Sequence, residues 1–121
     1  MLIRVDADSP RPLFEQIAAS VRGEVLAGRL RPGDRLPAAR EVAEAIDVNV
    51  HTVLRAYQQL RDDALIDLRR GRGAVVSASA GALVELREDI HALVDRAASL
   101  GLSATALAAL IQESDTRGQD S

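Results

Sequence analysis

Residues 36–76 read LPAAREVAEAIDVNVHTVLRAYQQLRDDALIDLRRGRGAVV, and this stretch decides the fold. A short amphipathic segment over 38–45 and a longer one over 49–61 are separated by a tight turn, Asp47-Val48. Two short apolar runs follow, with a loop of arginines and glycines between them. Two helices joined by a turn and followed by a cationic hairpin predict a winged helix-turn-helix. This module places its second helix in the DNA major groove.

The longer predicted helix, over 49–61, has one face for the core and one for a partner. The inward positions, spaced as on one side of a helix, are Val53, Ala56, Tyr57 and Leu60. The outward positions are Asn49, Val50, His51, Thr52 and Arg55. Because the outward set gathers at the N-terminal end, where helices of this kind touch bases, we expect it to bind DNA. The alternatives are a solvated His51, a solvated Arg55 and a Thr52 that only serves the first helical turn.

The two helices of the motif differ in how they begin. Asn49 is a good N-cap for the longer helix, whereas Ala38 is a poor cap for the helix over 38–45 and costs about 1 kcal/mol relative to serine. Arg40 stands four residues before Glu44, at the spacing of an intrahelical ion pair. Such a pair is the alternative to a role for this arginine in DNA binding.

A β-hairpin is expected after the two helices. Its strands are predicted over 65–68 and 74–76, on either side of a five-residue tip with two glycines. Three of the tip residues are cations, Arg69, Arg70 and Arg72, and they predict neutralisation of DNA phosphates or entry of one arginine into a narrow minor groove. Gly71 lets the backbone approach the DNA closely. A plain charged hairpin is the alternative.

An amphipathic helix is expected ahead of the motif. Its apolar face is formed by residues that recur every four positions: Leu13, Ile17, Val21 and Val25. Pro12 suits its first turn, and Gly28 suits its end. A Pro-Gly turn then leads to the motif, with Leu30 and Leu36 as anchors on either side.

After residue 81 the pattern becomes helical again, in two segments that Gly101 separates. Their apolar positions include Leu83, Leu86, Ile90, Leu93, Val94, Leu107 and Leu110. Ser103 can cap the second segment. Two helices with apolar stripes cannot bury themselves alone, so we expect them to pack against the same segment of a second chain as a homodimer. The alternative is that they fold back on their own winged domain.

Composition excludes several classes of protein. The chain of 121 residues has no cysteine, and its two histidines, His51 and His91, lie too far apart for a metal-binding spacing. We therefore expect no metal site and no cofactor. Enzyme activity is not expected either, because paired titratable groups and a glycine-rich phosphate loop are lacking. No apolar run reaches the roughly 20 residues of a membrane span, so a cytoplasmic protein with no membrane partner is expected.

Charge is distributed unevenly along the chain, whose net charge is −3. Residues 1–76 hold 12 of the 15 basic residues against 11 acidic ones, whereas residues 77–121 hold 3 against 7. All the cations are arginines, which bind guanine edges and phosphates in bidentate fashion. The acidic total supports a competing interpretation, a protein-interaction module that keeps the winged fold without binding DNA.

Five segments follow the order and spacing of a known family. They are PLFEQI (12–17), LAGRLRPGDRLP (26–37), REVA (40–43), VNVHTVLRAYQQL (48–60) and RRGRGAVV (69–76). Together they resemble the GntR-family transcriptional regulators, and among these the small YtrA-type subfamily. The resemblance implies transcriptional repression and an Arg40 that reaches DNA. The chain departs from it at Val50 and Leu54, where many larger members carry base-contacting arginines, and at Ala38, where a serine is usual.

The sequence thus predicts a mainly α fold with a small β-wing. The expected parts are a winged helix-turn-helix domain over 1–78, a helical dimerisation segment over 79–113 and a disordered tail over 114–121. A two-fold dimer matches a palindromic double-stranded operator whose half-sites lie about one helical turn apart. Base reading then rests on Arg40, His51, Arg55 and the wing, with Val50 against a thymine methyl. The operator sequence and any small-molecule effector stay open.

Overall fold

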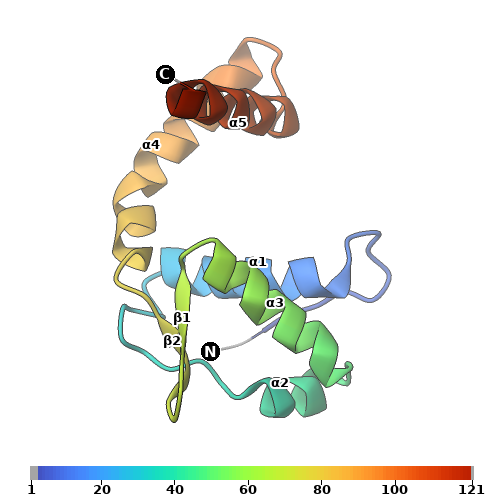
Figure 1. Cartoon of the computed structure of the whole chain (residues 1–121). Helices are drawn as coiled ribbons and strands as arrows, with labels where there is room; N and C mark the ends of the chain where they lie inside the picture. The colour runs from blue at the N-terminus through green and yellow to red at the C-terminus, as the bar shows by residue number, and fades with distance from the viewer. Residues whose placement is uncertain (1–2, 121) are drawn as a thin grey trace. The chain divides into compact units, whose positions relative to one another are not determined.

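The computed structural model describes the backbone of residues 3–120 and the side chains of residues 3–115 (Figure 1). Its helices are α1 (Leu13–Leu26), α2 (Ala39–Ile46), α3 (Val50–Asp62), α4 (Ala80–Ser99) and α5 (Ala104–Asp120), and its strands are β1 (Ile66–Arg69) and β2 (Gly73–Val76). The chain divides into two compact units, Met1–Glu85 and Leu86–Ser121, so the boundary lies within α4. The predicted mainly α fold with a small β-wing is confirmed.

The first unit is built around a core that α1, α2 and α3 share with the two strands. Among its members Ile17, Val21, Val53 and Leu60 are 0% exposed. These are positions that the helical spacing predicted, so the apolar period places α1 and α3 against each other. The anchors of the Pro-Gly turn, Leu30 and Leu36, are buried in the same cluster, as predicted. With one side of α3 fixed in the core, its other side faces outward.

Within residues 3–120, two residues other than glycine adopt a left-handed backbone conformation, and both lie at helix ends. Asp47, with φ 54°, ends α2 and makes the predicted turn before α3. Ala64, with φ 63°, follows α3, and its amide donates to the carbonyl of Arg61 at 2.9 Å. Glycine is the usual residue at such a position. Because residue 64 is an alanine, the sequence did not predict a left-handed turn after α3.

Replacing Ala64 with glycine is expected to raise the free energy of unfolding by about 0.5–1 kcal/mol. Glycine reaches a positive φ without a clash of the Cβ atom, and this relief outweighs its larger entropy loss on folding. Urea denaturation followed by circular dichroism measures the change. Ala45→Gly, on the exposed side of α2, is the control and should lower stability by about 1 kcal/mol. Equal losses in the two variants would contradict the argument.

The wing, which comprises β1, the turn 70–72 and β2, is an antiparallel hairpin in which Arg69 pairs with Gly73. Gly71 and Gly73 have φ values of 82° and 72°, so both tip glycines use the positive angles that the sequence predicted. The strands begin and end within one residue of the predicted ranges. The hairpin therefore places its arginines at and beside a tight tip.

A third extended segment pairs with β2 and widens the wing. The Gly33 amide donates to the carbonyl of Val76 at 2.8 Å, and the Leu36 amide donates to the carbonyl of Ala74 at 2.9 Å. The sequence predicted only a Pro-Gly turn in this region, because four residues are too few to show a strand pattern of their own. This pairing ties the approach to α2 directly to the wing.

The second unit contains the rest of α4 and all of α5. The Ser103 side chain caps α5 as predicted, since its Oγ accepts from the Ala106 amide at 3.1 Å. No single helix in the described part of the chain is both long and apolar enough to cross a membrane. Only α4 together with Ala104–Asp115, bent by 117°, reaches that length and composition.

The C-terminal tail differs from the prediction. A disordered tail was expected over 114–121, whereas the helical backbone of α5 continues to Asp120, and Ser121 lies outside the described residues. A polar stretch lacks an apolar stripe but retains helix propensity, so polarity alone does not end a helix. The Ser114 hydroxyl also donates back to the Leu110 carbonyl at 3.0 Å, as serine does inside helices.

Candidate nucleic-acid interface

The N-terminal half of α3 presents the residues that were predicted to meet DNA. Asn49 caps the helix as expected, because its Oδ1 accepts from the His51 amide at 2.8 Å. His51 is exposed and Thr52 is half-buried. Val50 is also half-buried and packs against the core, so it offers less surface to a thymine methyl than the sequence suggested. This end of α3 is therefore polar rather than cationic.

Arg40 is the second residue of α2 and is exposed. The ion pairs found within 4.0 Å among residues 3–115 do not include it, so the alternative pairing with Glu44 is not formed. As predicted, Ala38 makes no side-chain cap at the start of this helix. The guanidinium of Arg40 thus remains available to an external acceptor.

A hydrogen bond fixes the start of α2 against α3. The hydroxyl of Tyr57 donates to the carbonyl of Pro37 at 2.7 Å. Burial raises the pKa of Tyr57 well above its ordinary value, and the Glu41 carboxylate adds to the rise. The phenol therefore stays protonated and keeps its role as donor near neutral pH. In this way α2, with Arg40, is held in a fixed relation to α3.

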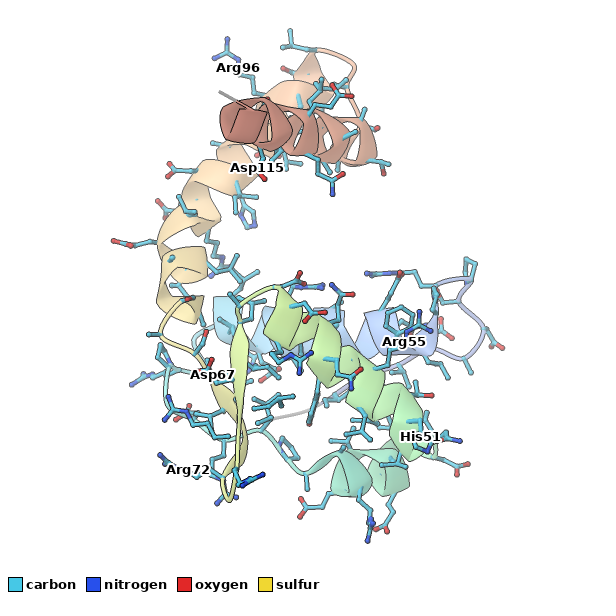
Figure 2. The ribbon with its side chains drawn as sticks, viewed as in Figure 1. His51, Arg55, Asp67, Arg72, Arg96 and Asp115 are labelled. Atoms are coloured by element: carbon cyan, nitrogen blue, oxygen red, sulfur yellow. The ribbon has the colours of Figure 1, made fainter. Side chains whose placement is uncertain are left out.

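Arg55 has a partner that the sequence did not reveal. Its guanidinium lies over the ring of Phe14, with Cζ 3.9 Å from the ring centroid. Figure 2 shows Arg55 beside the start of α1 and His51 nearer to α2. A cation–π contact at an exposed site is worth about 0.5–1 kcal/mol. A DNA acceptor must therefore compete with Phe14 for this side chain.

The wing arginines are not equivalent. The Arg69 guanidinium lies 3.7 Å from a carboxylate oxygen of Asp67, so part of its charge is neutralised. The ion pairs within residues 3–115 include neither Arg70 nor Arg72. Figure 2 shows Asp67 partway along the wing and Arg72 near its tip. The uncompensated positive charge of the wing therefore lies at the tip.

A fourth arginine, Arg35, lies beside the wing and was not among the predicted DNA-binding residues. Arg35 donates its Nε–H to the carbonyl of Arg72 at 3.1 Å. Between this arginine, the wing and α3 lies a hollow of about 280 Å³, whose lining includes Leu54 and Leu68, 42% and 45% exposed. The sequence indicated an outward-facing Arg35 only through its place before the inward-facing Leu36 in an extended stretch.

The residues predicted for dimerisation fall into three groups. Leu86, Ile90, Leu93 and Leu110 are exposed, by 51%, 43%, 45% and 49%. Val94 and Leu107 are half-buried. Leu83 is half-buried and packs against the core of the first unit, so only part of its surface is free for the dimer contact that the sequence predicts. The first turns of α4 belong to the winged unit, a boundary that the apolar stripe alone does not show.

Comparisons with known sequences agree with this architecture. Residues 13–76, from α1 to β2, match the family described as bacterial regulatory proteins, gntR family. The HTH-type transcriptional repressor YtrA of Bacillus subtilis (strain 168) is 33% identical over 125 residues, which cover 97% of this chain and 96% of that protein. The uncharacterized HTH-type transcriptional regulator YhcF of the same organism is 32% identical over 100 residues, which cover 78% and 83%.

Solved structures are similar as well. YtrA from Sulfolobus acidocaldarius, a GntR-family transcription factor, has a TM-score of 0.62 at 32% identity, covering 82% of this chain and 99% of that chain. A GntR family transcriptional regulator from Listeria monocytogenes has a TM-score of 0.63 at 26% identity, covering 88% and 97%. The chain therefore belongs to the gntR family of bacterial regulatory proteins and is a transcriptional regulator of the YtrA type.

Proposed function

We propose that the chain is a sequence-specific repressor that binds a palindromic DNA operator as a homodimer. In this proposal α3 lies in the major groove, and the wing tip lies on the flanking backbone or in the minor groove. The observation that carries the proposal is the polar N-terminal end of α3, capped by Asn49 and exposed at His51. It is supported by the tip arginines, Arg70 and Arg72, which have no acidic partner in the described part of the chain.

The proposed DNA-binding residues come from three elements. They are Arg40 on α2, Asn49, Val50, His51, Thr52 and Arg55 at or on α3, and Arg69, Arg70, Gly71 and Arg72 in the wing. Because α3 offers few cations, we assign most of the phosphate binding to Arg40 and the wing. Base reading then depends on the short polar side chains at the start of α3. Arg55 joins them if its guanidinium breaks its contact with the Phe14 ring.

The proposed dimer uses the second unit, which contains α5 and α4 from Leu86 onward, together with Leu83 in the part of α4 before it. Besides the exposed residues already named, Leu100 is 77% exposed and Ile111 is 54% exposed. Large apolar side chains gain roughly 25 cal/mol for each Å² removed from water, so covering them stabilises the protein. The cover that we propose is the same segment of a second copy, which also gives the two-fold symmetry that a palindrome requires.

Repression is proposed because relatives similar over nearly the whole chain include a protein named as a repressor. A regulator of this kind works in the cytoplasm, where its operator lies, and catalyses no reaction. A small-molecule effector is compatible with this proposal.

The test is selection of bound sequences from random double-stranded DNA, followed by mobility-shift assays of the enriched sequence at rising salt. We expect a palindromic consensus and an affinity that falls by orders of magnitude between 50 and about 200 mM salt, as phosphate contacts require. No enriched sequence and no specific complex at low salt would contradict the proposal. In that case an interaction module without DNA binding would be favoured.

Arg55→Ala is expected to weaken operator binding by about 1–3 kcal/mol and to relax base preference at one position of each half-site, if Arg55 reads a base. A uniform loss over all sequences would instead assign this arginine to phosphate. Phe14→Leu is the matched variant, because it removes the ring that holds the guanidinium and keeps Arg55 itself. If DNA competes with Phe14, this variant should bind the operator at least as well as the wild type.

A further inference from the structure

The hollow between the wing and α3 combines two chemistries on its lining. The cationic residues Arg35 and Arg72 are among those that line it, together with the apolar residues Leu54 and Leu68, which are 42% and 45% exposed. One unit of a DNA backbone carries the complementary pair, an anionic phosphate next to an apolar deoxyribose face. The hollow is therefore complementary to a sugar-phosphate unit in both charge and polarity.

We propose that Arg35 is a further DNA-contacting residue, which holds the wing tip in position and binds one backbone phosphate at this hollow. The adjoining deoxyribose packs on Leu54 and Leu68. This inference rests on the proposed DNA binding and deepens it, since it assigns a function to a residue outside both the recognition helix and the hairpin.

The backbone of Arg35 is fixed to the wing. It forms a β-bridge with Val75, and the amide of Val76 donates to the carbonyl of the neighbouring Asp34 at 2.8 Å. Since side chains alternate along an extended segment, burial of Leu36 directs the Arg35 side chain outward. Arg35 therefore starts from a rigid position beside the hairpin.

The side chain of Arg35 then fixes the wing tip. Its Nε–H donates to the carbonyl of Arg72 at 3.1 Å. Arg72 lies between Gly71 and Gly73, both at positive φ, so the tip backbone has little steric restriction of its own. Without this hydrogen bond the tip samples more conformations, and Arg72 loses its fixed direction.

The guanidinium of Arg35 has N–H donors that its hydrogen bond to the wing does not use. Arginine carries five N–H donors, and the bond to Arg72 uses the one at Nε. The ion pairs within residues 3–115 do not include Arg35. One carboxylate oxygen of Asp34 accepts from the Arg31 amide at 2.9 Å. The remaining N–H groups of Arg35 can therefore bind the oxygens of a phosphate.

A second hollow that Arg35 also lines is less suitable for a phosphate. It measures about 640 Å³, and two acidic residues, Asp34 and Glu41, are among those that line it. These negative charges repel an anion, whereas the hollow toward α3 has no acidic residue among those that line it. The phosphate is therefore assigned to the hollow that Arg35 shares with Leu54 and Leu68.

The experiment compares Arg35→Gln and Arg35→Lys with Arg31→Gln, an exposed control in the same turn with the same change of charge as Arg35→Gln. The probe is the double-stranded DNA that the wild-type chain enriches from a random pool. We expect Arg35→Gln to lower affinity roughly tenfold per bound chain. The slope of log affinity against log salt should become shallower by about 0.9 per chain. Ethylation of one phosphate per half-site should interfere with binding of the wild type but no longer with binding of Arg35→Gln.

The lysine variant separates the charge from the hydrogen bond to the tip. Arg35→Lys retains most of the salt slope, but backbone ¹⁵N relaxation of free protein should show greater motion at Arg72 and Gly73 in both Arg35 variants. Unchanged relaxation in both would overturn the positioning role. If Arg35→Gln matched Arg31→Gln in affinity, slope and ethylation pattern, the phosphate contact would be overturned.

Failure of this inference is distinguishable from failure of the proposed function. If the wild-type chain enriches no sequence and forms no specific complex, the proposed DNA binding is wrong and the phosphate contact falls with it. If the wild type binds and the Arg35 variants behave like the control, only the role of Arg35 is wrong.

Discussion

Replacing Leu86 and Ile90 together with glutamate is expected to produce a folded monomer whose operator affinity is about 100- to 10,000-fold lower. Both side chains are exposed, by 51% and 43%, so the substitution leaves the core of the winged unit intact. A carboxylate in an apolar dimer contact must lose its hydration, which opposes association. Each chain then binds one half-site alone and loses the gain from a second, linked contact.

Sedimentation equilibrium measures the oligomeric state, and mobility shift measures the affinity. The double variant adds two negative charges per chain, which alone weaken DNA binding. His91→Glu with Ala92→Glu is therefore the control, since it adds at least the same charge on exposed positions of α4 away from the apolar stripe. The control should remain dimeric and bind far better. A dimeric Leu86/Ile90 variant would show that this part of α4 does not form the contact.

The helices, the wing and much of the core could be predicted from the sequence because each depends on a local pattern. Ile17 and Val21 recur at helical spacing, and both are fully buried. The cap at Asn49 involves an amide only two residues away. Glycine and arginine alternate at the wing tip, where the positive φ angles were expected. Short-range periodicity and capping therefore account for these elements.

The contacts that orient the candidate site could not be predicted in the same way. The bond between Arg35 and Arg72 joins residues 37 positions apart, and the stacking of Arg55 on Phe14 joins two different helices. No spacing rule relates such segments, because the tertiary fold alone brings them together. The position of Leu83 shows the same limit, since an apolar stripe does not reveal which surface covers it.

Replacing both tip arginines, Arg70→Gln with Arg72→Gln, is expected to lower operator affinity on the order of 100-fold or more and to flatten its salt dependence. If each side chain neutralises one phosphate, a dimer loses four such contacts, and the slope of log affinity against log salt shrinks by about 3.6. Mobility shift over a series of salt concentrations measures both effects. Circular dichroism checks that the fold is retained.

Arg69 provides the matched comparison, because Asp67 already lies 3.7 Å from its guanidinium. A carboxylate partner neutralises part of the charge of an arginine and weakens its attraction for a phosphate. Arg69→Gln should therefore lower operator affinity much less than Arg70→Gln does. Asp67→Asn removes the competing carboxylate and should raise affinity in a background that keeps Arg69. If Arg69→Gln instead lowered operator affinity as much as Arg70→Gln, and Asp67→Asn left affinity unchanged, phosphate binding would not follow the uncompensated charge of the wing. The contact would then have to be assigned by the position of each arginine along the DNA.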